Sequence, residues 1–250
     1  MTRLVTAEIF KLRTTRTFYG IVGGALGLVL LIVIVAAATA TWNPGNIPMR
    51  DLLGISGFAQ VFALVLGILA LTSEFRHGTI TPSLLVVPDR VRLTLAKLGA
   101  SLATGLALGL AATGLTAAIG AAILNVRGID TGLTGSQVTK MVVGGTIAAA
   151  LYAALGVGVG ALVRNQVGAI VGTLVYLFVL ENLLQIVKAL RDPLAKYGFG
   201  GVGSGLTGTG DAGADHPPLG QASAGLVLAG YCAIFLLAGI AMMRRRDITA

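Results

Sequence analysis

The fold is decided by residues 74–97, which read EFRHGTITPSLLVVPDRVRLTLAK. This stretch is the only long polar interruption in the first half of a very apolar chain. On either side lies a segment without Asp, Glu, Lys or Arg, residues 52–73 before it and 98–126 after it. Each segment is long enough to cross a bilayer, since about 20 residues of helix span the roughly 30 Å hydrocarbon core. The stretch is therefore predicted to connect two membrane helices.

Composition points to the same class of protein. The chain has 250 residues, of which 55% are hydrophobic and 11% charged, and its mean hydropathy is +0.89. Soluble domains carry about 25% charged residues, so we expect an integral membrane protein. The net charge of +8 comes from basic residues that flank the apolar segments, as membrane anchors do, so no nucleic-acid partner is expected.

Six apolar segments predict an all-α membrane protein with a single transmembrane domain over residues 1–250. The predicted spans are residues 19–40, 52–73, 98–124, 141–163, 167–187 and 222–242. Ala36-Ala37-Ala38 imitates a signal-peptide cleavage site, but the first apolar stretch is longer than a typical signal core, so an uncleaved helix is preferred. The external segment 188–221 is too polar to span yet keeps apolar residues, which predicts interfacial or re-entrant pieces on the outer face.

Residues 1–16 are predicted to form an amphipathic helix at the membrane interface. Val5, Ile9 and Leu12 fall at helical spacing, and Glu8 and Lys11 are placed to pair with each other at i, i+3. A basic flank that only orients the first span explains the same charges.

The distribution of basic residues predicts the orientation. With the amino terminus inside, the inner segments hold four, four, one and three basic residues, which is twelve of the 18 in the chain. Basic residues are enriched in cytoplasmic loops, so both termini and residues 74–97 are expected in the cytoplasm.

Within residues 74–97, two prolines delimit a very short apolar helix. Thr81-Pro82 is typical of a helix start, and Pro88 ends the helix because the residue before proline leaves the helical region. The helix is too short to span and too apolar for water, so it needs a groove. That groove belongs either to a partner or to the chain's own membrane domain. Asp89 then caps the third span, and Lys97 is predicted to anchor this span at the lipid headgroups.

Several segments resemble type-2 permeases of ATP-binding-cassette (ABC) exporters. Residues 74–81 (EFRHGTIT), 87–92 (VPDRVR) and 96–98 (AKL) resemble the conserved connection between their second and third helices. Residues 8–16 resemble their amino-terminal connecting helix, and residues 158–166 resemble the turn before their fifth helix. Residues 197–208 and 244–248 resemble actinobacterial members.

This resemblance implies that the short helix of residues 82–87 docks on a separate ATPase subunit. The residues it assigns to ATPase coupling are Glu74, Arg76, Gly78, Thr79, Pro82, Leu84, Leu85, Pro88 and Arg90. It assigns Glu8, Lys11 and Arg16 to the connecting helix. The family works as two permeases and two ATPases, so the expected partners are that ATPase, a second permease copy and the bilayer of a bacterial cell membrane.

The nucleotide is expected on the partner chain. The sequence contains no Gly-Lys dipeptide, so the G-x-x-x-x-G-K-[ST] phosphate-binding loop is absent. ATP and Mg are therefore expected on the ATPase, and no cofactor is expected here. A metal site is not predicted either, because Cys232 is the single cysteine and neither His77 nor His216 has a second ligand at metal-binding spacing.

The expected function is the transmembrane subunit of an ATP-driven exporter that forms the translocation path. The alternative is an ATP-independent channel or ion-coupled carrier, which would be expected to show internal repeats and several intramembrane charges. A membrane enzyme is disfavoured because no paired carboxylates or Ser/His/Asp set accompanies the spans.

Three residues are candidates for a gate or substrate path. Glu181 is the sole carboxylate inside an apolar span, which marks a functional group by default. A structural hydrogen bond to Asn182 or to the outer loop is the other interpretation of Glu181. Phe62 and Tyr176 are candidates by their positions on the second and fifth spans.

Overall fold

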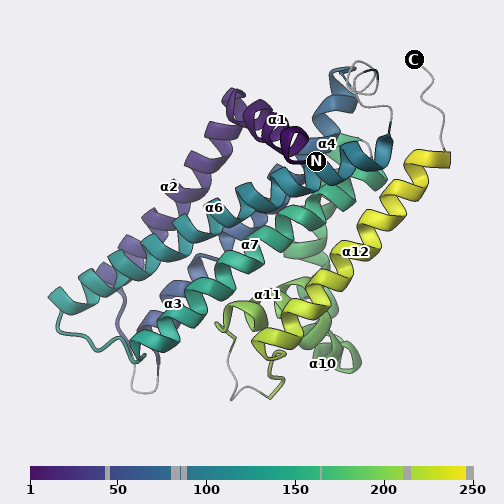
Figure 1. Ribbon diagram of the computed structural model, residues 1–250. Helices are drawn as coiled ribbons and strands as arrows, with labels where there is room; N and C mark the ends of the chain where they lie inside the picture. The colour runs from purple at the N-terminus through teal and green to yellow at the C-terminus, as the bar shows by residue number, and fades with distance from the viewer. Residues whose placement is uncertain (43–45, 80–84, 86–88, 164, 211–214, 246–250) are drawn as a thin grey trace.

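The computed structural model describes residues 1–42, 46–79, 85, 89–163, 165–210 and 215–245. All regular structure within these ranges is helical, and six helical segments there are long and apolar enough to cross a membrane (Figure 1). The prediction of an all-α protein with six membrane spans is confirmed. The six segments are Arg16–Thr39, Pro48–Arg76, Val91–Val126, Gly135–Val163, Gln166–Leu184 and Gln221–Met242.

The helices follow one another along the chain without a strand in the described ranges. They are α1 (Thr2–Arg13), α2 (Arg16–Thr39), α3 (Pro48–Ile55), α4 (Phe58–Arg76), α6 (Arg90–Val126), α7 (Gly135–Val163), α8 (Gln166–Val175), the π-helical turn η1 (Tyr176–Leu180), α9 (Glu181–Leu184), α10 (Lys188–Tyr197), α11 (Phe199–Thr207) and α12 (Gln221–Arg245).

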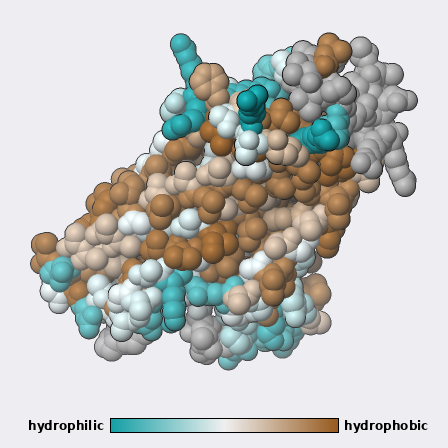
Figure 2. Space-filling model, in the orientation of Figure 1, coloured by the Kyte–Doolittle hydropathy of each residue, from teal (hydrophilic) through white to brown (hydrophobic). Residues whose placement is uncertain are grey.

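Different elements lie at the two ends of the bundle. Helix α1 lies at the same end as the last turns of α12, the end of α4 and the start of α6, whereas α3, α10 and α11 lie at the opposite end (Figure 1). Hydrophobic side chains form a wide band between these ends, and hydrophilic side chains gather at both ends (Figure 2). This distribution is what a bilayer-spanning bundle requires.

Helix α7 is the packing centre of the bundle, and glycines let α4 approach it closely. A Cβ atom on Gly67 would overlap the carbonyl oxygen of Ala153, and one on Gly156 would overlap the carbonyl oxygen of Leu64. Small residues let membrane helices pack backbone to backbone, since lipid supplies no hydrophobic drive for helix association. Gly67 and Gly156 therefore set the distance between α4 and α7.

The G-x-x-x-G step of Gly105 and Gly109 on α6 serves the same purpose within the chain. A Cβ atom on Gly105 would lie 2.7 Å from the Cα atom of Ala150, and one on Gly109 would lie 2.7 Å from the Cβ atom of Ala149. Both glycines thus face α7 of the same molecule, so this motif is used for internal packing.

Two spans differ in detail from their predicted outlines. The second span is built from α3 and α4, which meet at a turn where Ser56 donates a hydrogen bond to the carbonyl of Leu53 at 2.6 Å.

Helix α6, which forms the third span, begins at Arg90, well before the predicted start of that span. Asp89 caps it as predicted, because its Oδ1 atom accepts hydrogen bonds from the backbone N–H of Val91 at 2.9 Å and of Arg92 at 3.3 Å.

Helices α10 and α11, which lie between the fifth and sixth spans, are not among the segments long enough to cross a membrane. Helix α11 is packed against α7 and α12, and Val202 and Leu206 are buried there. It is preceded by α10, whose residues are exposed or half-buried.

Candidate functional site

Helix α1 lies against the start of α6. Gly99 of α6 makes room for it, since a Cβ atom there would come within 3.1 Å of the Cγ2 atom of Val5. The helix ends at Arg13, and Arg16, predicted to belong to the connecting helix, is instead the first residue of α2.

An ion network joins α1 to α4 and α6 at this end of the bundle. Lys97 Nζ lies 2.8 Å from Glu8 Oε2 and 2.9 Å from Glu74 Oε1, and Lys11 Nζ also forms an ion pair with Glu74 Oε1. Two carboxylates and two ammonium groups therefore alternate across three helices. We call Glu8, Lys11, Glu74 and Lys97 the ion network.

The centre of the ion network is removed from solvent. The side chains of Lys97 and Glu74 are 1% and 2% exposed, and that of Glu8 is 15% exposed. Taking charges out of water costs several kcal/mol per ion, so such a pair persists only with good geometry and several partners. Because each central group has two oppositely charged neighbours, the ion network fixes the relative positions of α1, α4 and α6.

Helix α4 ends at Arg76, two residues beyond Glu74, at the beginning of residues 74–97. Gly78 adopts a φ of 66°, in the left-handed region where a side chain is disfavoured. The N–H of Thr79 donates to the carbonyl of Glu74 at 3.0 Å, and that of Gly78 donates to the carbonyl of Phe75 at 3.4 Å. This is glycine-terminated helix capping, and it directs the chain away from α4.

A cavity of about 470 Å³ opens beside the ion network. Glu74, Lys97 and Arg76 contribute to its polar wall, and Phe18 and Leu66 contribute to its apolar wall. Arg76 also reaches α8, where its Nη1 donates to Gln166 Oε1 at 3.4 Å. The cavity therefore lies where α1, α2, α4, α6 and the start of α8 meet.

At the opposite end, Glu181 binds the beginning of α11. Its side chain is 3% exposed, and its Oε1 atom accepts a hydrogen bond from the N–H of Gly200 at 2.8 Å. A helix N-terminus has unpaired N–H groups and a partial positive charge, so a carboxylate is a favourable cap. The structure therefore supports the structural interpretation of Glu181, whose partner lies in the segment between the fifth and sixth spans.

Two tyrosine hydroxyls hold the same region. Tyr152 of α7 donates to the carbonyl of Phe199, and Tyr231 of α12 donates to the carbonyl of Tyr197 at 2.8 Å. Together with Glu181, three different spans bind the junction between α10 and α11.

The structure separates the three gate candidates. Tyr176 lies near Glu181, because its ring packs edge-on against Phe199 at a centroid distance of 5.3 Å. Phe62 instead packs, half-buried, in the hydrophobic cluster that includes α2 and α3. Glu181 and Tyr176 therefore share one region, and Phe62 belongs to another part of the core.

A group of exposed polar side chains lies at the same end of the bundle. Asp192 Oδ1 lies 3.1 Å from His216 Nδ1, and Asp192 Oδ2 lies 3.4 Å from Lys196 Nζ. The hydrogen bonds from His216 and then Lys196 lower the pKa of Asp192 below its usual value. In the described part of the chain, His, Cys, Asp and Glu side chains form no group of three that could hold a metal ion.

Comparison with known families identifies the chain. The family model described as "ABC-2 family transporter protein" matches residues 4–180, from α1 to the end of η1. The chain belongs to the ABC-2 transporter family. No curated protein matches the chain.

Membership in the ABC-2 family makes the chain a membrane permease component of an ABC transporter. The six apolar spans agree with a multi-pass transport subunit. The match includes both α1 and the α4–α6 connection, so the ion network lies wholly inside the family region.

Several residues assigned to coupling in ABC-2 permeases can be located. Glu74 is in the ion network, Arg76 lines the adjacent cavity, and Gly78 and Thr79 form the turn after α4. Leu85 is helical and 80% exposed. Pro82, Leu84 and Pro88 lie outside the described residues, as does the side chain of Arg90.

Sequence reasoning misplaced one central residue of this ABC-2 site. Lys97 was predicted to anchor α6 at the headgroups, but it is buried and bridges two carboxylates. The expected pair within α1 is also wrong, since Glu8 binds Lys97 and Lys11 binds Glu74. The sequence did mark Lys97, because residues 96–98 belong to the segments that resemble the family.

Proposed function

We propose that this permease is the transmembrane subunit of an ATP-driven exporter and couples, through residues 74–97, to a separate ATPase subunit. ATP and Mg bind on that partner, and a second permease copy completes the translocation path. The assembly resides in a bacterial cell membrane with both termini of this chain in the cytoplasm.

The ion network is the observation that carries this proposal. Residues 74–97 begin and end in it, since Glu74 lies at the end of α4 and Lys97 lies two turns into α6. A force applied to the connection therefore reaches α4 and α6 directly and reaches α1 through the ion pairs of Glu8 and Lys11. An isolated connecting loop would need no such buried ionic anchor.

The exposed position of Leu85 fits docking on a partner. Its side chain is 80% exposed, although burying a leucine is worth about 1.5–3 kcal/mol. Movement of a docked ATPase then displaces the ends of α4 and α6, and the ion network moves α1 with them. In this mechanism the membrane helices change between inward-facing and outward-facing arrangements.

The fifth span offers a surface for the second permease copy. Apolar residues on its exposed face include Val167, Val171, Val179 and Leu183, each more than half exposed. A second copy that covers part of this face would place the path between the two chains.

Replacing Leu85 with aspartate is expected to reduce the amount of co-purified ATPase at least about tenfold, because a charge would enter an apolar contact. The measurement is co-purification of the tagged permease with the ATPase encoded alongside it. Leu190→Asp is the matched control, since Leu190 is an exposed leucine on α10 at the opposite end of the bundle.

The companion variant Glu74→Gln is expected to keep the ATPase bound but to lose most ATP-driven transport, because the ion network would be weakened. Normal ATPase association and transport in both Leu85→Asp and Glu74→Gln would contradict the proposal. Transport that persists with no ATPase present would favour the channel or carrier instead.

The orientation can be tested with single cysteines in a Cys232→Ala background. Leu85→Cys is expected to react with a membrane-impermeant maleimide only after the membrane is opened. Ser136→Cys, an exposed position at the start of α7, is expected to react in intact cells. The reverse labelling pattern would place residues 74–97 outside and would rule out the proposed coupling.

A further inference from the structure

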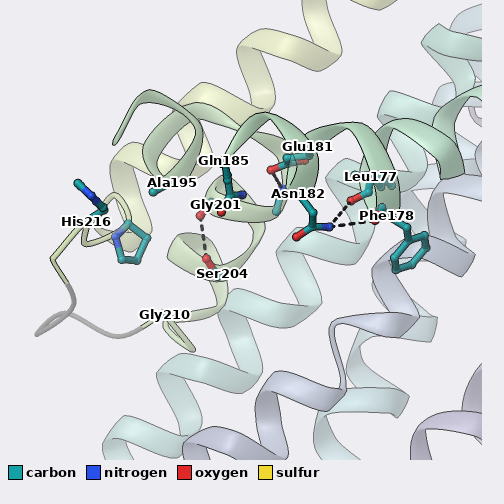
Figure 3. Close-up of a pocket in the computed structure, with 12 residues that line it drawn as sticks. Leu177, Phe178, Glu181, Asn182, Gln185, Ala195, Gly201, Ser204, Gly210 and His216 are labelled. Carbon is teal, nitrogen blue, oxygen red and sulfur yellow. Dashed lines mark hydrogen bonds between the residues drawn. The ribbon is translucent and has the colours of Figure 1, made fainter. Parts of the chain in front are cut away.

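A pocket of about 430 Å³ lies at the outer end of the fifth span, between α9 and the α10–α11 segment. Its volume is in the range of small-molecule sites, about 300–1,000 Å³. In Figure 3, Glu181, Asn182 and Gln185 come from one side of this pocket, and Ser204 and Gly201 come from the facing segment. The ABC-2 family match ends at residue 180, just before these residues.

One oxygen atom of the Glu181 carboxyl group, Oε2, accepts no hydrogen bond from the described residues. Oε1 accepts from the N–H of Gly200, whereas Oε2 is buried and has no hydrogen-bond partner among the described residues. A buried carboxylate oxygen that accepts no hydrogen bond of ordinary geometry is costly, so a further donor at this position is favourable.

The neighbouring polar groups also offer acceptors. The amide nitrogen of Asn182 donates to the carbonyls of Phe178 at 3.1 Å and Leu177 at 3.5 Å, which leaves its oxygen turned the other way (Figure 3). The Ser204 hydroxyl donates to the carbonyl of Gly201 at 3.0 Å, so its lone pairs remain available. The donor hydrogens of both side chains are thus used within the protein.

The described lining of the pocket contains an acidic residue but no Lys or Arg. Glu181 is that acidic residue. His216 also lines the pocket, but its Nδ1 is paired with Asp192. The backbone N–H of Gly200, near the N-terminus of α11, donates to this carboxyl group. A ligand therefore meets a carboxyl group and further acceptors, with no basic Lys or Arg in the described lining.

An aromatic wall completes the site. Phe178 lines the pocket with its side chain half exposed, and Leu177 adds an apolar surface beside it. Aromatic faces attract organic cations, by about 0.5–2 kcal/mol depending on desolvation. A metal ion gains nothing from these apolar groups and requires more oxygen ligands.

We propose that this pocket binds a protonated organic amine, whose ammonium group donates to the Glu181 carboxylate and Asn182 while its apolar part packs on Leu177 and Phe178. The site lies at the outer end of the bundle, so such an amine is placed to be released outward. This last step rests on the proposed exporter function, whereas binding itself does not.

Binding to the purified full-length chain in lipid nanodiscs tests the proposal without the ATPase. Three probes of one shape are used: phenethylammonium, neutral 2-phenylethanol and anionic phenylacetate. Like a lysine side chain, the amine is protonated at neutral pH. In isothermal titration we expect phenethylammonium to bind about 10- to 100-fold more tightly than 2-phenylethanol, and phenylacetate to bind more weakly than both. Equal affinities for the amine and the alcohol in the wild-type chain would overturn the proposal.

Glu181→Gln removes the charge and keeps an oxygen for the N–H of Gly200. We expect this variant to lose the preference for the amine and to bind 2-phenylethanol as the wild type does. Asp130→Asn is the matched control, because Asp130 is an outer-loop carboxylate that does not line the pocket and its bond to the N–H of Gly132 suits an amide oxygen equally. Undiminished amine binding by Glu181→Gln would show that Glu181 only caps α11.

Failure of this proposal is distinguishable from failure of the proposed function. If the amine does not bind but the ATPase still co-purifies and Leu85→Asp releases it, the exporter assignment stands and the substrate class is wrong. If the amine binds but no ATPase associates, the pocket stands and the chain works without ATP.

Discussion

Replacing Lys97 with methionine is expected to lower the free energy of unfolding by about 3–5 kcal/mol, since removing one partner of a buried ion pair leaves the other charge uncompensated. In this case two carboxylates are affected, because Lys97 Nζ binds both Glu8 and Glu74. Methionine keeps most of the apolar length of lysine, so the change isolates the charge. The measurement is detergent-driven unfolding of the purified chain, monitored through the mobility of α1.

Lys196→Met is the matched control for Lys97→Met. Lys196 also pairs with a carboxylate, but the side chains of Lys196 and Asp192 are 35% and 51% exposed. Solvent-exposed ion pairs contribute about 0–1 kcal/mol, so this variant should unfold almost as the wild type does. Similar losses for Lys97→Met and Lys196→Met would mean that the ion network does not hold α1, α4 and α6 together.

The double variant Lys97→Met, Glu74→Gln sharpens the same test. In Lys97→Met, Glu74 keeps its ion pair with Lys11 but loses the buried one with Lys97, so removing its charge should return part of the lost stability. A double loss equal to the sum of the single losses would show that these two groups act independently.

The six spans were predictable because their signal is local. A segment such as 98–124 has no charged residue over a length that crosses a bilayer, so composition and length suffice. The cap at Asp89 was predictable for a similar reason, since it depends on the next three residues of the chain alone. These features need no knowledge of which helices touch.

The ion network was not predictable in the same way, because it depends on the packing of three helices. Glu8 and Lys11 are close along α1, which suggested a pair, but α6 presents Lys97 to Glu8 and α4 presents Glu74 to Lys11. Lys97 heads an apolar segment, where lysines commonly reach the headgroups, whereas here it lies between Glu8 of α1 and Glu74 of α4.

The site around Glu181 was predictable in part. An acidic residue within an apolar span singled out Glu181, and a bond to the outer loop was one of the two interpretations considered. Its partner, the N–H of Gly200, is a backbone group on a helix that no side-chain pattern indicates. The separation of Phe62 from Glu181 likewise follows from packing, since both positions are compatible with a path when only span numbers are known.

Gly156→Ala is expected to destabilise the bundle by about 3 kcal/mol or more, the upper part of the range for overpacking. Alanine is ordinarily the better helix former by about 1 kcal/mol, so a helix with free space at this position would be stabilised. Here the added Cβ atom would overlap the Leu64 carbonyl oxygen and lie 2.9 Å from the backbone nitrogen of Ile68. Backbone atoms cannot rotate away, so α4 and α7 must separate.

Gly230→Ala on α12 is the control for Gly156→Ala, because a Cβ atom placed there has no heavy atom within 4 Å from the described residues beyond its own stretch of helix. Thermal unfolding in nanodiscs should therefore give a large decrease in melting temperature for Gly156→Ala. For Gly230→Ala the melting temperature should rise slightly or stay unchanged. An unchanged melting temperature for Gly156→Ala would contradict the close approach of α4 and α7. Because Glu74 follows Gly67 by two turns on α4, the same approach also sets where the ion network meets α6.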